Sequence, residues 1–520
     1  MNGEHFTTTA ALDDAAVRFG DDIAVVDGDV RLTFAELRTA AWTVGRALMT
    51  LGVEPDDRVA LWIPNTHHWV VGALAAHVAG GQLVPVNTRY TAGEAADLLA
   101  RTRARVLFVP ELFLGNDRLT DLTECDLPDL RAVVSVDIEG RRTARPRGPW
   151  DVEVFWNDLS TLAKETAEET KRHMSGSVTA DHVSDILFTS GTTGRSKGAM
   201  SSHRQALAVA RSWAECTGLR RGDRYLVVNP FFHSFGYKAG LLASLLVGAT
   251  IYPMAVYDPA GALTAIARHA ITVLPGAPTI YRTIIDHPER NEHDLSSLRL
   301  AVTGAAAVPK SLLRDMRRYL NIETILTAYG LTEAVVATMC RPGDDDDTVS
   351  TTSGRAAAEF EVRIDDTGEI LLRGPNVMLG YLDDPDASSV AIDADGWLHT
   401  GDIGRLDDRG YLTVTDRLKD MYIAGGFNVY PAEVEQAIIG FEGVADAAVF
   451  GIPDARLGEA GLAVVVPARN GGALNIDALL AHCRHHLANF KIPKKFELRQ
   501  SLPRNAGGKV LKDVLREEFR

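Results

Sequence analysis

The sequence predicts an α/β protein: a large N-terminal domain of mixed and parallel sheets covered by helices, followed by a small α+β C-terminal domain. Two observations carry this prediction. From Val25 to Gly304, short apolar runs alternate with helix signals, a rhythm typical of parallel strands joined by helices. Near Tyr381 this rhythm gives way to short strands and turns, and a compact unit follows from about Asp420.

Local signals place the individual elements. The run from Val25 to Val30 sets Asp-Gly between β-branched residues, which predicts a hairpin. Thr33 with Glu36, and Thr91 with Glu94, have the spacing of capping boxes and predict helix starts. Strands are expected at 58–64, 82–87, 105–110, 225–230, 249–253, 271–276 and 298–304. In the C-terminal unit we expect helices at 431–438 and 475–487, and strands at 446–451 and 461–467.

Composition is that of an ordinary globular protein, and the charge argues against a nucleic-acid partner. Hydrophobic residues make up 46% and charged residues 24%. Lys and Arg number 54 against 69 Asp and Glu, which gives a net charge of −15. Binding to phosphate backbones needs clustered Lys and Arg, so no nucleic acid is expected. The acidic run 343–348 is interpreted as a solvated loop rather than a metal site.

Nothing in the sequence predicts secretion or membrane insertion. The N-terminus lacks the basic-then-apolar pattern of a signal peptide. The longest apolar stretch, from Trp69 to Val86, is interrupted by His77, glycines and Gln82, and falls short of a membrane span. The four cysteines are scattered without a CxxC pair, so neither a zinc site nor a disulfide framework is expected. We expect a reduced, cytoplasmic protein, with a homodimer as the candidate oligomer.

The stretch FTSGTTGRSKGAM, Phe188–Met200, is the strongest local signal for chemistry. It holds three glycines, five hydroxyl-bearing residues and Lys197, between a strand signal and a helix expected near Ser202. Backbone N–H groups and hydroxyls in such a loop can cradle phosphate oxygens, and the lysine adds positive charge. The loop lacks the GxxxxGK[ST] order of a Walker motif. It therefore predicts a phosphate-binding loop of another kind.

Two other interpretations of this stretch stay open at this point. Gly194–Gly198 matches the GxSxG pattern of a hydrolase elbow, with Ser196 as nucleophile. Such an elbow needs a strand that runs directly into the first glycine, and here TSGTT intervenes. The second interpretation is a flexible turn without function. A fluorophosphonate probe would detect the hydrolase.

Further segments follow the loop in a consistent order. They are PFFHSFG (230–236), VTGAAAVP (302–309), YGLTE (329–333), LRGPNVMLGY (372–381), GWLHTGDIG (396–404), DRLKDMYIAGGFNVYPAEVE (416–435) and PRNAGGKV (503–510). Each motif alone is weak, but the ordered set resembles the adenylate-forming superfamily of acyl-CoA synthetases, peptide-synthetase adenylation domains and luciferases. The resemblance covers nearly the whole chain. One departure is Ser196, where this family usually has a proline that stiffens the loop.

The resemblance implies that ATP activates a carboxylic acid as an acyl-adenylate, after which the thiol of CoA displaces AMP. The implied cofactors are ATP, Mg²⁺ and CoA. Lys197, Glu333, His233 and Lys509 are the implied catalytic residues, and Thr192 and Glu333 the metal ligands. The residues implied in nucleotide binding are Thr189, Ser190, Gly191, Thr192, Thr193, Gly194, Gly304, Ala305, Tyr329, Gly330, Thr332, Asp402 and Arg417. Taken singly, Tyr329, Asp402 and Arg417 could equally be core, turn and surface residues.

The resemblance also implies a division into residues 1–416, which bind nucleotide and acid, and a mobile unit of residues 417–520. Lys419 matches the hinge about which this unit rotates. Lys509 would bridge the carboxylate and the α-phosphate during adenylation and leave afterwards. Gly425 and Gly426 would then face the site and give room for the pantetheine arm of CoA.

Several details narrow the expected substrate. No carrier domain is expected after Lys509, and the acyl segment offers His233 where amino-acid activators place an aspartate. The segments at 87–95, 194–198, 230–240 and 416–435 resemble actinobacterial ligases for steroid-ring remnants, the hexahydroindane propanoates. The expected pocket walls are Phe232, His233, Phe235, Gly236, Tyr237, Ala305–Ala307 and Val335–Val336, which suits a compact alicyclic acid. The alternatives are a medium-chain or aryl acyl-CoA ligase and an acyl-AMP ligase that loads a carrier protein.

Overall fold

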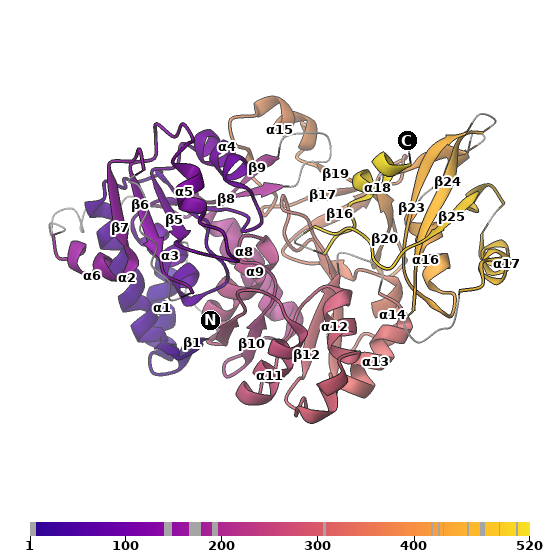
Figure 1. Ribbon diagram of the computed structural model, residues 1–520, viewed down its shortest axis with the longest axis horizontal. Coiled ribbons are helices and arrows are strands. Elements are labelled where there is room, and N and C mark those ends of the chain that lie inside the picture. The colour runs from indigo at the N-terminus through magenta and orange to yellow at the C-terminus, as the bar shows by residue number, and fades with distance from the viewer. Residues whose placement is uncertain are drawn as a thin grey trace.

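The computed structural model describes residues 7–139, 148–165, 178–189, 196–304, 308–417, 420–424, 427–429, 431–454, 457–468, 474–487, 489–505 and 508–519. It has the predicted α/β architecture: helices cover large sheets in the first 400 residues, and a smaller unit of sheet and helices follows (Figure 1). In Figure 1 the smaller unit lies on the right, in yellow, against the orange and pink strands of the larger part.

The largest sheet has eight strands and is mostly parallel. Strands β3 to β8 of this sheet pair in parallel, whereas β9 pairs antiparallel with both β8 and β18. The two-residue strand β18 forms one edge. In spatial order the strands are β18 (Gly380–Tyr381), β9 (Lys197–Ser202), β8 (Val183–Thr189), β4 (Gln82–Pro85), β3 (Arg58–Leu61), β5 (Val106–Pro110), β6 (Ala132–Val136) and β7 (Val152–Phe155).

Two four-stranded groups are joined into a second sheet by a single residue. Val273 forms parallel bridges to Tyr225 on one side and Leu300 on the other. The strand expected at 271–276 is thus reduced to one bridging residue, which is a correction. In spatial order, the first group is β2 (Val30–Thr33), β1 (Ile23–Asp27), β11 (Thr250–Pro253) and β10 (Arg224–Val227). The second group is β12 (Leu300–Gly304), β13 (Thr324–Tyr329), β14 (Thr338–Met339) and β15 (Arg355–Ala356).

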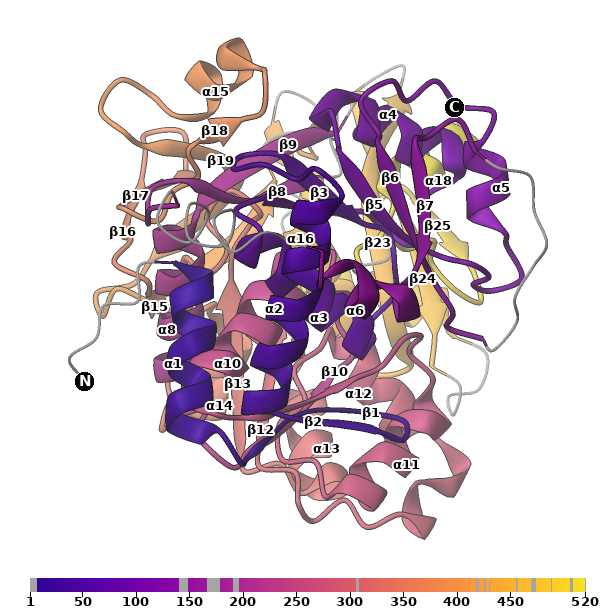
Figure 2. The ribbon, with the colours of Figure 1, turned by 90° about the vertical axis from the view of Figure 1, so that its left-hand side faces the viewer.

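The helices start where the local signals predict. Thr33 and Thr91 both form reciprocal capping boxes, with Glu36 and Glu94, so both predicted starts are confirmed. Helix α3 contacts strands of both large sheets and is apolar on all sides, as expected for a helix packed between layers. The helices of the larger part include α1 (Thr8–Phe19), α2 (Phe34–Thr50), α3 (His67–Val78), α4 (Ala92–Thr102), α8 (His203–Thr217), α10 (Ala243–Val247), α11 (Pro259–His269), α12 (Pro278–Ile285), α13 (Lys310–Leu320) and α15 (Pro385–Ala391). Figure 2 shows α1, α2 and α3 side by side.

An antiparallel sheet follows the larger sheets. It consists of β16 (Glu361–Ile364), β17 (Glu369–Arg373), β19 (Leu398–Leu406) and β20 (Leu412–Arg417). One of its faces forms an apolar cluster that also takes in Ala199 of β9 and Val209 of α8. This contact fixes the antiparallel sheet against the end of the eight-stranded sheet where the phosphate loop is expected.

The C-terminal unit is a sheet with a helical layer on each face. Along β23, Ala447 and Val449 belong to one apolar cluster while Ala448 and Phe450 belong to another, as the two-residue period of a strand requires. Helices α16 (Pro431–Ile439) and α17 (Ile476–His486) cover one face and α18 (Lys512–Glu518) the other. The strands are β21 (Tyr422–Ala424), β22 (Phe427–Val429), β23 (Val444–Asp454), β24 (Gly458–Pro467) and β25 (Lys495–Leu498).

Candidate active site

Strands β8 and β9 hold the two ends of the expected phosphate loop. Their last pair joins Thr189 to Lys197, so residues 190–196 connect neighbouring strand ends. Gly198 follows directly, and a Cβ atom there would lie 2.9 Å from the Ile186 side chain and 3.0 Å from the Phe188 ring. Glycine therefore lets the two strands close at the base of the loop. The sequence predicts a loop up to Ser202, and the strand β9 is a correction to that expectation.

The strand β9 also removes the context that a hydrolase elbow needs. Ser196 lies between the loop and a strand, whereas the elbow places its serine between a strand and a helix. The helix α8 begins only at His203, with Ser202 as its N-cap and Gln205 completing a capping box. The geometry around Ser196 thus favours a phosphate loop over a nucleophile.

Tyr329 and Asp402, which the resemblance assigns to adenine and ribose, lie together. The Tyr329 hydroxyl donates a hydrogen bond of 2.7 Å to Oδ2 of Asp402. Asp402 is 3% exposed and pairs across β19 and β20 with Arg417, so the backbone brings the third expected residue beside it. Chain segments more than seventy residues apart thus converge on one position at the end of β13.

Two glycines near Tyr329 lie where the surrounding backbone leaves no room for a side chain. A Cβ on Gly304 would lie 2.7 Å from the carbonyl oxygen of Ala328, and one on Gly330 would lie 1.7 Å from that of Val335. The tight turn after Tyr329 closes with a hydrogen bond from the Val335 N–H to the Leu331 carbonyl. Glycine is thus required by close backbone approach, and Thr332 and Glu333 lie within this turn.

Glu333 is held at both its backbone and its side chain. Its carbonyl oxygen accepts a hydrogen bond of 2.8 Å from Met378, and its Oε1 accepts one of 2.7 Å from the Tyr381 hydroxyl. A carboxylate oxygen suits Mg²⁺, which in nucleotide sites is often held by one or two carboxylates and the substrate phosphates. Within the described part of the chain, no three or more His, Cys, Asp or Glu side chains form a group that could hold a metal ion by themselves.

The acyl segment is anchored by Asn65, which sequence reasoning missed. Its Oδ1 accepts from the Phe231 N–H at 2.7 Å, and its Nδ2 donates to the carbonyls of Val227 and Asn229. The buried amide thus fixes the turn that precedes His233. Tyr237, expected as a pocket wall, is a correction: its ring is fully buried and its hydroxyl contacts His77 at 2.9 Å.

The hydrogen bonding of His233 favours a neutral imidazole that can donate from Nε2. Its Nδ1 accepts a hydrogen bond of 3.1 Å from the Phe235 N–H, so the ring proton of the neutral form lies on Nε2. Desolvation by the surrounding protein lowers the pKa of His233, which favours the neutral ring. The neutral imidazole can donate from Nε2 to a carboxylate.

The loop that carries Lys509 lies against the larger part of the molecule. Arg504 and Val510 form an antiparallel bridge, and the Lys509 N–H donates to Oδ1 of Asn505 at 2.9 Å. Arg504 also pairs with Asp446, which ties the loop to β23. Gly508 adopts φ +81°, and a Cβ there would lie 3.4 Å from Cβ of Ala277, at the start of α12. The loop therefore reaches the side of the larger part that carries the acyl segment.

A buried carboxylate supports the turn that carries Asp402. Glu369 accepts from the Gly401 N–H at 2.8 Å through Oε1, and its Oε2 lies 2.9 Å from Nδ1 of His399. Gly401 adopts φ +68°, which favours glycine. The hydrogen bond to Glu369, together with the nearby charge of Asp393, raises the pKa of His399.

This raised pKa predicts a pH dependence of stability. The folded protein binds the His399 proton more tightly than the unfolded chain, so the stabilisation is complete below the unfolded value of about 6.5 and is lost as pH rises through the higher folded pKa. We expect His399→Asn to reduce the free energy of unfolding more at pH 6 than at pH 9. Denaturant titrations at both values measure this, and an equal loss at both would contradict it.

Lys238 and Asp185 form an ion pair that the sequence analysis did not anticipate. Their side chains are 1% and 0% exposed, and Nζ lies 2.9 Å from Oδ1. Lys238 also donates to Oγ of Ser201 at 2.8 Å, and the Ser184 hydroxyl donates to Oδ2 of Asp185 at 2.6 Å. Lys238 lies on a π-helix, Tyr237–Leu242, directly after the acyl segment. The pair therefore ties this segment to the strands of the phosphate loop.

Several expected site residues lie outside the described part of the chain. They are Ser190, Gly191, Thr192, Thr193, Gly194, Ala305, Lys419, Gly425 and Gly426, and the description of Arg417 is limited to its backbone. The site roles assigned to these residues stay predictions. Gly304, which precedes one of these gaps, pairs with Ala328, and Arg417, which precedes another, pairs with Asp402.

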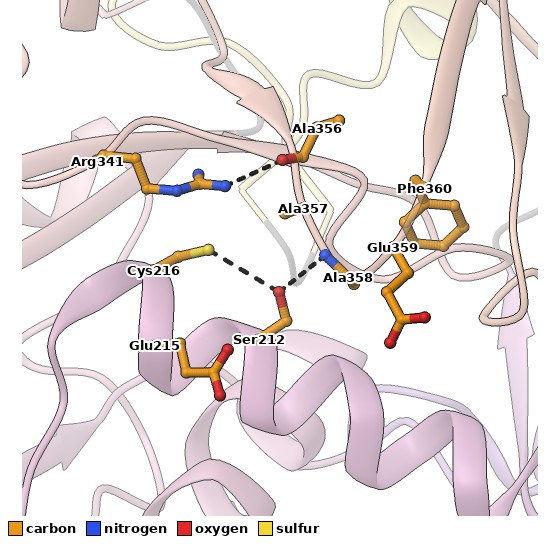
Figure 3. Close-up of a pocket in the computed structure, with 9 residues that line it drawn as sticks. All are labelled: Ser212, Glu215, Cys216, Arg341, Ala356, Ala357, Ala358, Glu359 and Phe360. Carbon is orange, nitrogen blue, oxygen red and sulfur yellow. Dashed lines mark hydrogen bonds between the residues drawn. The ribbon is translucent and has the colours of Figure 1, made fainter.

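A separate pocket lies on the outer side of α8. It encloses about 340 Å³ between α8 and the segment that leads into β16, and Figure 3 shows its residues. The Ser212 hydroxyl accepts from the Ala358 N–H at 2.8 Å, and burial raises the pKa of Cys216, so its thiol stays protonated. None of its lining residues is one expected in the active site.

No helix in the described ranges is both long and apolar enough to cross a bilayer.

Comparison with known proteins agrees with the architecture. Residues 12–382 match the family model of AMP-binding enzymes, and residues 433–509 match that of the AMP-binding enzyme C-terminal domain. Among solved structures, ATP-bound MatB from Rhodopseudomonas palustris superposes with a TM-score of 0.85 at 28% identity, over 99% of both chains. The anthranilate CoA ligase AuaEII with anthranoyl-AMP gives 0.86 at 27% identity, over 98% of this chain and 97% of that one.

Two curated relatives are much more similar in sequence. One is the 3-[(3aS,4S,7aS)-7a-methyl-1,5-dioxo-octahydro-1H-inden-4-yl]propanoyl:CoA ligase of Rhodococcus jostii strain RHA1, 55% identical over 519 residues and the full length of both chains. The other is the ligase of the same name from Mycobacterium tuberculosis strain ATCC 25618 / H37Rv, 56% identical over 514 residues and 98% of both chains. The resemblance inferred from the ordered motifs is thereby confirmed: the chain belongs to the AMP-binding enzyme family.

Proposed function

We propose that this protein is an ATP-dependent, AMP-forming acyl-CoA ligase for a bicyclic propanoate left by steroid-ring degradation. The observation that carries the proposal is the identity of 55% over the full chain to a ligase for such an acid. The site geometry supports it, since residues suited to phosphate, metal, adenine and ribose converge at the ends of β8, β9, β13 and β19.

The proposed chemistry places each described residue in a role. Lys197, at the end of the phosphate loop, balances the negative charge of the phosphates. Glu333 would hold Mg²⁺ through its carboxylate, and the cation would supply positive charge to the phosphates. Tyr329 packs beside adenine and Asp402 accepts from the ribose hydroxyls. His233 donates from Nε2 to the acid, which orients its carboxylate.

The proposal includes a rotating C-terminal unit. We place the boundary between residues 416 and 417, with the hinge at Lys419, and assign the approach of CoA to the glycines at 425 and 426. The C-terminal domain model matches from residue 433, and the contact of Gly508 with Ala277 supports an arrangement in which Lys509 serves adenylation. Use of Mg²⁺, a homodimer and a cytoplasmic location stay predictions.

The substrate is tested by comparing two acids. The acyl segment presents the partly buried rings of Phe232 and Phe235 and the exposed side chain of His233 before the buried Tyr237. We expect kcat/KM for a bicyclic propanoate to exceed that for palmitate by at least about tenfold, or about 1.4 kcal/mol of transition-state preference. AMP release with ATP, Mg²⁺ and CoA is the measurement.

The outcomes separate the alternatives. A better rate with palmitate would reject the bicyclic acid and leave an acyl-CoA ligase of another specificity. Adenylate formation without transfer to free CoA would favour a ligase that loads a carrier protein. If folded enzyme gives neither pyrophosphate exchange nor thioester across a broad panel of acids, the proposed function is wrong.

A further inference from the structure

The segment Met378–Leu382 lies between β9, the strand that begins at Lys197, and the turn that carries Glu333. On one side it runs antiparallel to β9: Leu379 donates to the Met200 carbonyl at 2.8 Å and Leu382 to the Gly198 carbonyl at 2.8 Å. On the other side, Met378 donates to the Glu333 carbonyl. One stretch of backbone therefore fixes the position of two site elements relative to each other.

Within this segment, the side chain of Tyr381 contacts both expected charged ligands. Its hydroxyl donates to Oε1 of Glu333 at 2.7 Å, and Nζ of Lys197 lies 5.0 Å from the centroid of its ring. The second contact has the geometry of a cation–π interaction. In the sequence, Tyr381 is simply the last residue of the motif LRGPNVMLGY.

Tyrosine has the right chemistry for this position. It is a neutral donor, so it can orient a carboxylate without cancelling the negative charge that would attract a cation, as Lys or Arg would. A phenolic hydroxyl ordinarily loses its proton only at about pH 10, so it remains a donor at neutral pH.

We propose that Tyr381 is a positioning residue for the metal–nucleotide complex: its hydroxyl orients the Glu333 carboxylate toward the cation, and its ring holds the Lys197 ammonium at the exit of the phosphate loop. Because Tyr381 fixes Oε1, the plane of the carboxylate is set, and the group would be presented to the metal in one orientation. The inference rests on the proposed function, since it assumes that ATP binds with a divalent cation.

Equilibrium binding of ATP separates the two contacts of Tyr381. Tyr381→Phe removes only the hydroxyl and keeps the ring beneath Lys197. Partners that orient a metal ligand are typically worth 10–100-fold in metal affinity. We expect calorimetric titration to show that Tyr381→Phe weakens ATP binding about tenfold with Mg²⁺ and less than twofold with EDTA. Tyr381→Leu also removes the ring, and should weaken binding several-fold in EDTA as well.

A matched control lies elsewhere in the structure. Tyr411 donates to Oδ1 of Asp344, also at 2.7 Å, so Tyr411→Phe removes a tyrosine–carboxylate hydrogen bond of the same length. It should leave ATP binding unchanged under both conditions. In a Glu333→Gln background, Tyr381→Phe should have no further effect on binding with Mg²⁺, because the carboxylate that it positions is gone.

The results separate the positioning role of Tyr381 from the proposed function on which it rests. If the unsubstituted enzyme does not bind ATP with Mg²⁺, the proposed function fails. If the unsubstituted enzyme binds ATP, two results would show that the positioning role is wrong. One is that Tyr381→Phe lowers the affinity equally with Mg²⁺ and with EDTA, and the other is that it lowers the affinity under neither condition. An undiminished effect of Tyr381→Phe in the Glu333→Gln background would also overturn it.

Discussion

Replacing Lys509 by alanine should slow formation of the acyl-adenylate by about 10²–10³-fold, the usual cost of removing one preorganised charge donor from a transition state. The loss should be confined to the first half-reaction. Thioester formation from a supplied acyl-adenylate should largely persist, because Lys509 is expected to have left the site by then. Pyrophosphate exchange and single-turnover thioester formation measure the two steps separately.

The structure shows how the loop that carries Lys509 is held in place. The hairpin formed by Arg504 and Val510 fixes its base, Asp446 anchors Arg504, and Gly508 allows the backbone to pass close to Ala277. Lys495→Ala is the matched control, since Lys495 lies on the same unit in an exposed ion pair with Glu497. Equal losses in both half-reactions would indicate a folding defect and argue against domain alternation.

Replacing Lys238 by methionine should destabilise the fold by about 3–5 kcal/mol, because it leaves the Asp185 carboxylate buried without its cation. Both partners are nearly inaccessible to solvent, so water cannot compensate. Guanidinium denaturation at neutral pH measures the loss.

The double variant Lys238→Met with Asp185→Asn is the test of this explanation. Replacing both members of a buried ion pair is often close to neutral, and an asparagine can still accept from the Ser184 hydroxyl. Most of the lost stability should therefore return. A double variant as unstable as Lys238→Met alone would show that lost packing, and not the unpaired charge, causes the effect.

Local signals predicted the elements that local physics controls. The capping boxes at Thr33 and Thr91 were correct because a cap depends on residues three positions apart. The strand β9 was missed because Lys, Gly, Ser and Met carry little strand propensity, and its pairing with β8 decides its conformation. Likewise, 271–276 has the composition of a strand, but only Val273 meets neighbours on both sides.

The candidate site shows the same division. The ordered motifs predicted which segments matter, and Tyr329 and Asp402 are in contact although 73 positions separate them. The supporting residues could not be predicted in this way. Asn65, Lys238, Glu369 and Tyr381 act through contacts that span between 30 and 166 positions of the chain, and no spacing in the sequence signals such pairs.

The position of β18 at the rim of the eight-stranded sheet also bears on how the protein behaves in storage. An open sheet edge is a template for pairing with other chains, and proteins commonly protect it with very short outer strands. Here two residues, Gly380 and Tyr381, cover the side of the six-residue strand β9. If this segment came away, the backbone groups of β9 would be open to a neighbouring molecule. Conditions that destabilise the contact of β18 with β9 should therefore also promote aggregation. Ligands that stabilise the nucleotide site should reduce aggregation.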